Sequence, residues 1–381
     1  MPNRFIEAAI IDDGVHLGSF PQEKKWIVDE NLDISLYQSH IIEENHAAVC
    51  MGVMQKYVDM EHVFWHSIKV LKDDTKRGYI GRFLKALELC EELGVKLIHL
   101  SIGSTCYEDF RPIQIIVERL LKKGVILVSA TSNEGVVTYP AYISNVISVK
   151  CDPQLTDDAY TFQHDPIERI SFQASSRHQL GLGGQKTVSS VCNSYAAPLI
   201  TAKVISHLIN DPKLNCEKII PLLIAGATNS NLREACSDDK DKIDFPNNAM
   251  LDSPDIPIVV LSGFDSQHLI DLICELSACL KTDDYNVRVA LEHPLATYLD
   301  MTPVRVSTDI ENYVRKMNSY FNCEIILLGF SPPIQPERCR SASLWIWGTE
   351  QGYEVPEDQV GIIVKNESGQ ALYEKMLSIL L

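Results

Sequence analysis

The chain has 381 residues, 45% hydrophobic and 22% charged, which is the composition of an ordinary soluble globular protein long enough for two domains. Its formal net charge is −17 and it carries no Lys/Arg block, which argues against nucleic acid as a main partner. No uninterrupted apolar run approaches the ~18–20 residues that a membrane-spanning helix needs, so we expect no membrane partner either.

Strands and helices alternate through the first half of the chain. Residues 5–11 form an apolar run typical of a buried parallel strand, and Asp12-Asp13-Gly14 follows as a loop. The later segments are extended residues 26–28 and 34–37, a helix at 46–57, a strand at 62–71, a helix at 79–93, a strand at 96–101, a helix at 112–123, and strands at 125–129 and 146–149. This alternation predicts an α/β fold, a parallel sheet with helices on both faces. Residues 152–190 are rich in turns, and we expect them to be irregular.

A turn-prone run of small residues, Cys192 to Pro198, precedes the apolar segment 199–205. A proline in the first turn of a helix loses no intrahelical hydrogen bond, so Pro198 indicates that a buried helix begins here. Ser194 then lies at the helix N-terminus, where free N–H groups and the helix dipole favour negative charge. An acyl-transfer nucleophile needs this setting, although a serine that merely caps the helix is the simpler alternative.

Three other stretches contain residue types that act with such a serine. Asp12 follows the first strand, and His46 opens the helix predicted at 46–57. Asn133 lies in an Asn-Glu-Gly turn directly after the strand at 125–129. In chain order these residues are Asp, His, Asn and Ser, which is the subtilisin order of a Ser-His-Asp triad with an asparagine available as oxyanion donor.

Together these stretches resemble the subtilase (subtilisin-like serine protease) family over roughly residues 5–210. Motif positions match at Asp12, at His46 and Gly52 of a His-Gly-Thr-x-Val-Ala-Gly block, at Asn133 and Gly135 of a Gly-Asn-x-Gly block, and at Ser194, Ala196, Ala197 and Pro198 of a Gly-Thr-Ser-Met-Ala-Ala-Pro block. The segment Leu97 to Gly103 also resembles the strand and Ser-x-Gly stretch that lines the family's substrate cleft. Segments in the family's order make a strong joint signal, although each alone is weak.

The resemblance implies a serine endopeptidase that needs no cofactor or metal and takes a peptide or protein substrate. Ser194 would attack the peptide carbonyl, His46 would take its proton, and Asp12 would orient the imidazole. The Asn133 side chain and the Ser194 N–H would hold the oxyanion. The substrate would pair as an added strand with the cleft segment, which consists here of Ser101, Ile102 and Gly103.

Several motif positions depart from the family pattern. Asp13 stands where the family has Ser or Thr, Ala47-Ala48 and Cys192-Asn193 each replace Gly-Thr, and Ser132 replaces a glycine. A second carboxylate beside Asp12 could disturb the triad's electrostatics, and Cys192 would be strained in a backbone that needs glycine. These departures favour a rival hypothesis, a pseudoprotease that binds a peptide or partner protein without cutting it.

The sequence also carries signals about compartment and redox state. Residues 1–7 lack the charged-then-apolar pattern of a secretion signal, and the first strand starts so early that we expect no inhibitory pro-segment before it. The eleven cysteines are spaced singly, with no C-x-x-C pair, as expected of reduced thiols in a cytosolic protein; Cys192 is the thiol whose modification could affect Ser194. The acidic pairs at 73–74 and 157–158 are typical of solvated turns rather than calcium sites. We therefore expect a cytoplasmic processing enzyme of narrow specificity, such as one that trims the leader of a ribosomally made peptide in a bacterial maturation system.

The first domain is expected to span residues 1–228, closing with a helix at 217–227, and the polar stretch 229–255 is typical of a linker. A second, smaller α/β domain follows at 256–381, with strands at 257–263, 286–291, 323–328, 343–347 and 361–364 and helices at 266–280, 310–320 and 369–381. Its opening resembles a degenerate P-loop-like or Rossmann-like unit, because residues 262–268 lack the Gly-Lys-Ser/Thr that holds phosphate. A nucleotide-dependent regulator is therefore a third hypothesis, and the role of this domain is otherwise unknown.

Overall fold

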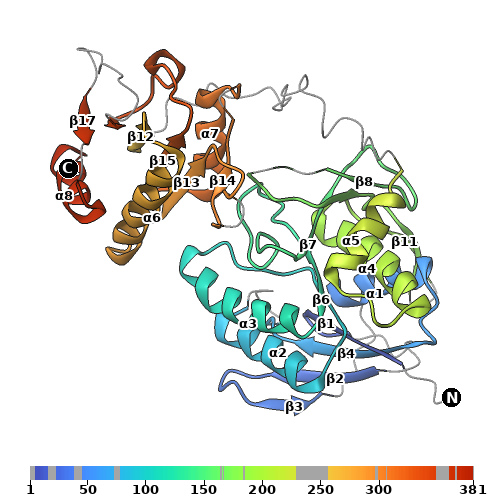
Figure 1. The fold of residues 1–381 in the computed structure, drawn as a ribbon. Coiled ribbons are helices and arrows are strands. Elements are labelled where there is room, and N and C mark those ends of the chain that lie inside the picture. The colour runs from blue at the N-terminus through green and yellow to red at the C-terminus, as the bar shows by residue number, and fades with distance from the viewer. Residues whose placement is uncertain are drawn as a thin grey trace. The chain divides into compact units, whose positions relative to one another are not determined.

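The structure is a computed structural model that describes residues 5–15, 23–37, 45–72, 78–163, 165, 167–182, 185–228, 256–296, 299–305, 307–348, 360–364 and 367–380. The chain divides into two compact units, Met1–Leu232 and Arg233–Leu381, here called the N-terminal and C-terminal units. The predicted linker at 229–255 lies outside the described residues, so the domain bounds 1–228 and 256–381 stay a prediction. Both units consist of parallel strands covered by helices (Figure 1).

The N-terminal unit is built on a nine-stranded sheet with the order β3-β2-β4-β1-β5-β6-β7-β9-β8. Neighbouring strands run parallel except at the two edges, where the β2–β3 and β8–β9 pairs are antiparallel. The strands are β1 (Ile6–Asp12), β2 (Glu23–Val28), β3 (Ile34–Leu36), β4 (Val63–Lys69), β5 (Leu97–Leu100), β6 (Ile126–Ala130), β7 (Ile147–Cys151), β8 (Tyr160–Phe162) and β9 (Phe172–Ala174). The first strand in the chain therefore lies inside the sheet, between β4 and β5.

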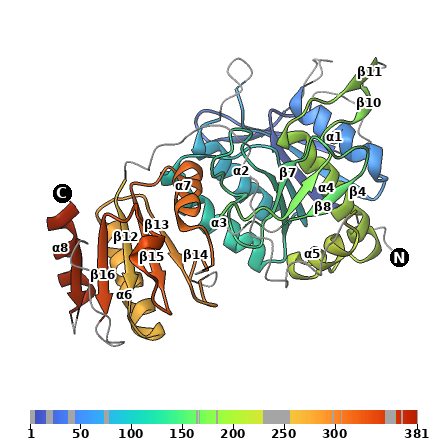
Figure 2. The same cartoon turned by 90° about the horizontal axis from the view of Figure 1, so that it is seen from above.

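Helices cover both faces of this sheet, as the alternating pattern predicts (Figures 1 and 2). On one face α1, α4 and α5 share a core with the sheet, and α2 and α3 pack against each other on the opposite face. The helices are α1 (His46–Tyr57), α2 (Ile80–Leu93), α3 (Phe110–Lys122), α4 (Asn193–Asn210) and α5 (Cys216–Ala225), with a short 3₁₀ turn at Tyr107–Asp109. None of the helices in the described part of the chain combines the length and apolarity needed to cross a lipid bilayer.

The alternation of side chains along a strand decides which polar groups reach the α1/α4 face. Ile6, Ala8 and Ile10 of β1 lie in the core shared with α1 and α4, so Asp12, two residues further, points to the same face. Leu97 of β5 lies in that core as well, which places His99 on the same face. The sheet thus presents an acid and a histidine to the helices near the carboxyl ends of its strands.

Helix α4 begins at Asn193, with Cys192 as its N-cap residue. The backbone of Cys192 is extended (φ −161°, ψ 160°), a conformation that any residue adopts, so the strain expected from the missing glycine does not arise. Pro198 lies inside α4 rather than in its first turn, because the helix starts earlier than the proline indicated. The prediction for Pro198 was therefore wrong by about one turn, and the missing N–H removes a hydrogen bond that a helix normally makes to the carbonyl of Ser194.

The segment 152–190 is more ordered than its turn-rich sequence indicates. It contains β8 and β9, which extend the main sheet, and a two-stranded antiparallel hairpin formed by β10 (Gln179–Leu182) and β11 (Gln185–Val188). The expectation of an irregular segment was wrong because short edge strands leave little periodicity to recognise. Residues 183–184, between β10 and β11, lie outside the described residues.

The C-terminal unit has a six-stranded, wholly parallel sheet with the order β14-β13-β15-β12-β16-β17. Helices α6 and α8 share one hydrophobic core with its strands, while α7 buries its apolar side chains outside that core. The elements are β12 (Ile258–Ser262), α6 (Ser266–Thr282), β13 (Val287–Leu291), β14 (Thr302–Pro303), α7 (Ile310–Phe321), β15 (Ile325–Phe330), a 3₁₀ turn at Pro336–Arg338, β16 (Leu344–Gly348), β17 (Gly361–Val364) and α8 (Gly369–Leu380). This is the second α/β unit that the sequence predicts.

Candidate active site

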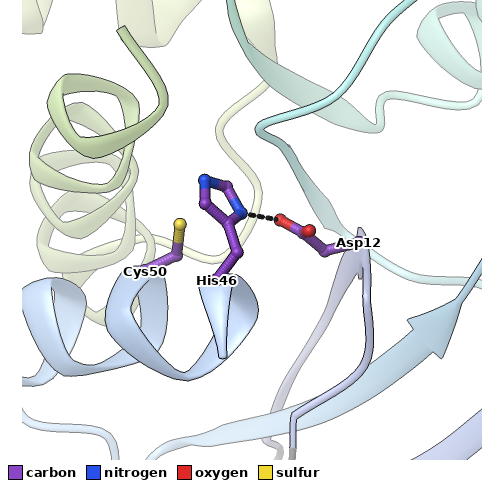
Figure 3. A group of neighbouring side chains, drawn as sticks. All are labelled: Asp12, His46 and Cys50. Atoms are coloured by element: carbon purple, nitrogen blue, oxygen red, sulfur yellow. Dashed lines mark hydrogen bonds and ion pairs between the residues drawn. The ribbon is translucent and has the colours of Figure 1, made fainter. Parts of the chain in front are cut away.

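The centre of the site is a hydrogen-bonded pair, Asp12 and His46 (Figure 3). The Oδ2 of Asp12 lies 2.8 Å from the Nδ1 of His46. The carboxylate is almost fully buried at the end of β1, whereas the imidazole keeps 30% of its side chain exposed. A buried carboxylate on Nδ1 fixes the ring orientation and directs Nε2 away from Asp12. The sequence-predicted acid and base are therefore brought together in the geometry of a catalytic pair.

Asp13 has a separate function, which the sequence alone does not reveal. Its carboxylate accepts hydrogen bonds from the Asn45 side chain (2.8 Å), the Ala47 N–H (3.0 Å) and the His46 N–H (3.3 Å) at the start of α1. Asn45 is itself the N-cap and accepts from the Ala48 N–H. The Asp13 charge is thus placed at the positive end of a helix dipole and locks α1 beside β1. The second carboxylate thus holds the start of the helix that carries His46.

Ser194 and Ser101 each donate a hydrogen bond from the hydroxyl to the backbone carbonyl of the other. The Ser101 hydroxyl donates to the Ser194 carbonyl at 3.0 Å, and the Ser194 hydroxyl donates to the Ser101 carbonyl at 3.5 Å. The Cys50 thiol of α1 approaches the same place, 3.6 Å from the Ser194 carbonyl. The first turn of α4, the end of β5 and α1 therefore meet at Ser194.

Asn133 is held next to the start of α4 through Asn193. The Asn193 N–H donates to the Oδ1 of Asn133 at 2.8 Å, and an N–H donor can bond only the oxygen of the amide. The buried side chain of Asn193 in turn donates to the carbonyl of Ser132 (2.8 Å) and accepts from the Cys151 N–H (2.8 Å). With its oxygen bonded to α4, the Asn133 side chain presents Nδ2 as the end that can donate to an oxyanion.

Two residues of the site carry no assigned role in the sequence analysis. The ring of Tyr195 stacks on the ring of His46, with centroids 5.2 Å apart and planes 30° apart. Burial, followed by the neighbouring Cys50, Cys192, Asp12 and Asp13, raises the pKa of the Tyr195 phenol, so the ring is neutral. His99 lies fully buried beneath Ser101. The only sequence signal for either was its place in a recognised segment, directly after Ser194 and within the stretch 97–103.

An open cleft of about 620 Å³ runs over the Asp–His pair. Its lining consists of Asp12, Asp13, Asn45, His46, Val49, Leu71, Ser101, Ile102, Thr187, Val188, Ser189, Ser190 and Tyr195. A smaller hollow of about 120 Å³ lies along the same segment and is lined by Val70, Leu71, Gly78, Tyr79, Ile80, Phe83, Ile102, Gly103, Ser104 and Asp109. Gly103 has no room for a side chain, because a Cβ there would lie 2.6 Å from the Tyr139 carbonyl. The predicted cleft segment 101–103 therefore borders both hollows.

Asp12, His46 and Cys50 also form a compact set of possible ligand atoms, all within 4.8 Å of one another (Figure 3). We assign this set to the Asp–His pair and not to a metal centre. The pair already satisfies the Asp12 oxygen and the His46 Nδ1. Burial raises the pKa of the Cys50 thiol well above its usual range, so the neutral thiol is favoured over the thiolate that binds metals. Of the acidic pairs, Asp158 forms an ion pair with Lys203 (2.8 Å), and residues 73–74 lie outside the described residues.

The C-terminal unit has a different arrangement at its first strand–loop–helix. Asp265 caps α6 by accepting from the N–H groups of Gln267 (2.9 Å) and His268 (3.0 Å). Phe264 is fully buried, and a Cβ on Gly263 would lie 2.9 Å from the Gly348 carbonyl. The helix N–H groups that would bind phosphate are thus already bonded to a carboxylate, so nothing at this loop favours the nucleotide hypothesis.

No protein-family model and no curated protein matches the chain. Solved structures similar to it include a cold-adapted subtilisin-like serine proteinase, at 16% identity and a TM-score of 0.45, over 58% of this chain and 82% of that one. The prenylagaramide maturation protease PagA is similar at 18% identity and a TM-score of 0.42, over 60% of this chain and 84% of that one. The protease domain of PatA is similar at 15% identity and a TM-score of 0.46, over 60% of this chain and 91% of that one.

Proposed function

We propose that the N-terminal unit is a serine-type endopeptidase of the subtilisin-like kind, with Asp12, His46 and Ser194 as its triad. The observation that carries the proposal is the buried Asp12 carboxylate on the Nδ1 of a His46 that opens onto a cleft. A carboxylate in this position selects the tautomer in which Nε2 can accept a proton, and it stabilises the imidazolium that forms. The Ser194 hydroxyl, on the first turn of α4, is the nucleophile that this base serves.

The proposed reaction uses groups whose positions are described above. Ser194 turns its hydroxyl from the Ser101 carbonyl toward the Nε2 of His46, transfers its proton and attacks the substrate carbonyl. His46 then delivers the proton to the leaving amine, and water repeats the cycle on the acyl-enzyme. The Nδ2 of Asn133 and the Ser194 N–H hold the oxyanion, and losing one such donor costs about 2.7–4 kcal/mol of transition-state stabilisation.

We further propose an extended peptide substrate that pairs with residues 101–103 and is cleaved with narrow specificity. The hollow beside this segment is lined by apolar groups such as Leu71, Phe83 and Ile102, which suit an apolar substrate side chain. Peptide processing is the role that fits such selectivity, and the structurally similar protein PagA is a maturation protease. Indiscriminate digestion of unfolded casein by the purified chain would contradict this part of the proposal.

A peptide-binding pseudoprotease is the competing function, and one observation favours it. In the structure the Ser194 hydroxyl contacts the Ser101 carbonyl at 3.5 Å instead of His46. The Tyr195 ring stacks on the His46 imidazole, which must accept the Ser194 proton for the serine to react. A site that binds peptides without cutting them would keep the same cleft. The two functions differ in whether Ser194 reacts.

The test is labelling of the full chain with a fluorophosphonate probe. We expect labelling that is lost in Ser194→Ala and in His46→Ala. Ser190→Ala is the matched control, because Ser190 lines the same cleft and lies outside the triad. A folded chain that stays unlabelled, as judged by circular dichroism and a cooperative thermal transition, would reject the peptidase and favour the pseudoprotease.

A further inference from the structure

The carbonyl of Ser194 lacks the partner that a regular helix would give it. In α4 the acceptor at residue 194 pairs with the N–H of residue 198, and that residue is Pro198, which has no N–H. A carbonyl that is partly shielded from water and left without a hydrogen bond destabilises the fold. The first turn of α4 therefore needs another donor at the position that carries the proposed nucleophile.

Ser101 supplies that donor from its position directly after β5. Its hydroxyl lies 3.0 Å from the Ser194 carbonyl, closer than the Cys50 thiol at 3.6 Å. The carbonyl of Ser101 meets the Ser194 hydroxyl as well, so one residue contacts both polar ends of Ser194. The orientation of the Ser101 hydroxyl accordingly fixes where the first turn of α4 lies.

His99 sits directly behind Ser101 and links it to a later turn of α4. Its Nε2 lies 2.9 Å from the Ser101 hydroxyl, and its Nδ1 lies 2.8 Å from the hydroxyl of Thr201. His99 and Thr201 are both fully buried. Burial, helped by the nearby His46, lowers the pKa of His99 to about 3, so the ring is neutral and carries one N–H.

One placement of that proton gives Thr201, Ser101 and the Ser194 carbonyl their best hydrogen-bond partners. With the proton on Nε2, His99 donates to Ser101, Ser101 donates to the Ser194 carbonyl, and Thr201 donates to Nδ1. With the proton on Nδ1, the Ser101 hydroxyl must turn to Nε2, and the Ser194 carbonyl keeps only the weak thiol donor of Cys50. The alternative acceptor for Thr201 is the Ala197 carbonyl at 3.1 Å, which α4 already engages through its regular helical hydrogen bond.

We propose that the buried column Thr201–His99–Ser101 is a positioning device for Ser194, with His99 in its Nε2–H form. It replaces the helix hydrogen bond that Pro198 removes and holds the first turn of α4 against β5. His99 touches no substrate and is a positioning residue. The inference rests on the proposed role of Ser194 as the nucleophile.

The kinetic test compares rates of fluorophosphonate labelling well below each variant's thermal midpoint. His99→Phe fills the space without the hydrogen bonds, and Thr201→Val removes one hydroxyl; we expect both to slow labelling about 10- to 100-fold, the effect of a misplaced nucleophile. His99→Gln keeps a donor and an acceptor, and it should recover part of the rate. The matched control is Ser206→Ala, because Ser206 also donates to its own helix, at the Ala202 carbonyl (3.0 Å), and lies outside the column.

A purely structural role predicts a different pattern. His99→Phe and Thr201→Val would then melt at lower temperature but label at the rate of the unmodified chain, and that result would overturn the proposal. If His99→Gln restores part of the labelling rate but not the thermal midpoint, the effect of His99 on Ser194 is a positioning effect and does not follow from stability.

A second measurement does not depend on activity. The imidazole ¹⁵N spectrum of the full chain should contain a histidine that stays neutral at pH 5 as the Nε2–H tautomer. Its signals should move in Thr201→Val and be absent in His99→Gln, which distinguishes His99 from His178, whose pKa burial also lowers. An Nδ1–H tautomer of His99 would overturn the proposed positioning role of the column, even if Ser194 reacts with the probe. Absence of all labelling together with the expected tautomer would reject the peptidase while the hydrogen-bonded column stands.

Discussion

Each unit has a loop with acidic residues at the carboxyl end of its first strand, and the two loops use their acids differently. In the C-terminal unit the single acid Asp265 caps α6, and buried Phe264 fills the space before it. In the N-terminal unit the loop has two acids: Asp13 binds the N-terminus of α1, and Asp12 remains to hold His46. A helix N-terminus takes up one carboxylate, so only a second acid is available for chemistry.

The largest effect is expected at Asp12. Asp12→Asn keeps the shape of the side chain but favours the wrong tautomer of His46, and we expect the rate of fluorophosphonate labelling to fall about 10⁴-fold. This rate is measured by quenching the labelling reaction at successive times and quantifying the labelled protein by mass spectrometry. A rate within tenfold of the unmodified chain would mean that the Asp12–His46 bond serves only the fold.

Acid should destabilise the N-terminal unit through its buried histidines. Burial lowers the pKa of His99 to about 3, from an ordinary value of 6.5, and lowers the pKa of His178 as well. The unfolded chain then binds more protons than the folded one below about pH 6.5, so stability falls as pH falls, by about 1.4 kcal/mol per pH unit for His99 and further through His178. Hydrogen exchange by mass spectrometry, which reports each unit separately, should show a shallower loss between pH 6 and pH 4 in His99→Gln.

The two capping acids allow a direct comparison of stability with activity. Asp13→Ala and Asp265→Ala each remove a carboxylate from a helix N-terminus, and each should lower the free energy of unfolding of its own unit by about 1–2 kcal/mol. Only Asp13→Ala should also slow labelling, and less than Asp12→Asn does, because α1 carries His46. Equal labelling rates in the two variants would disprove the supporting role of Asp13.

The smallest expected effect is at the loop of the C-terminal unit. Because Asp265 already occupies the N–H groups of α6, ATP or GTP with Mg²⁺ should leave the thermal midpoint of the chain unchanged. A nucleotide-dependent rise in the midpoint that disappears in Gly263→Val would revive the regulator hypothesis.

Periodicity and turn residues were sufficient to predict the helices and the longer strands, but not the short strands β8 to β11. The helix predicted at 46–57 is α1 in the structure, and the second α/β unit has its helices where the apolar spacing placed them. Spacing also located the acid and base at the ends of their elements. These features depend on neighbours in the chain, which a sequence displays directly.

Contacts between distant segments could not be predicted in the same way. His99 meets Thr201 across 102 positions of the chain, and Asp13 caps a helix whose first N–H groups lie more than thirty positions away. A single buried histidine in an apolar strand looks like any core residue, and a second aspartate looks like a disturbance. Only the fold shows that both support their neighbours.

The place of β1 in the sheet also has a consequence for biosynthesis. Asp12 belongs to β1, which is translated before β4 and β5, yet β1 needs both of these strands on either side before it is held. Ser194 follows much later, at the start of a helix that packs on the finished sheet. In a nascent chain the three residues of the proposed triad therefore stay apart until α4 has been translated, so the proposed peptidase activity would arise only after most of the N-terminal unit has been made.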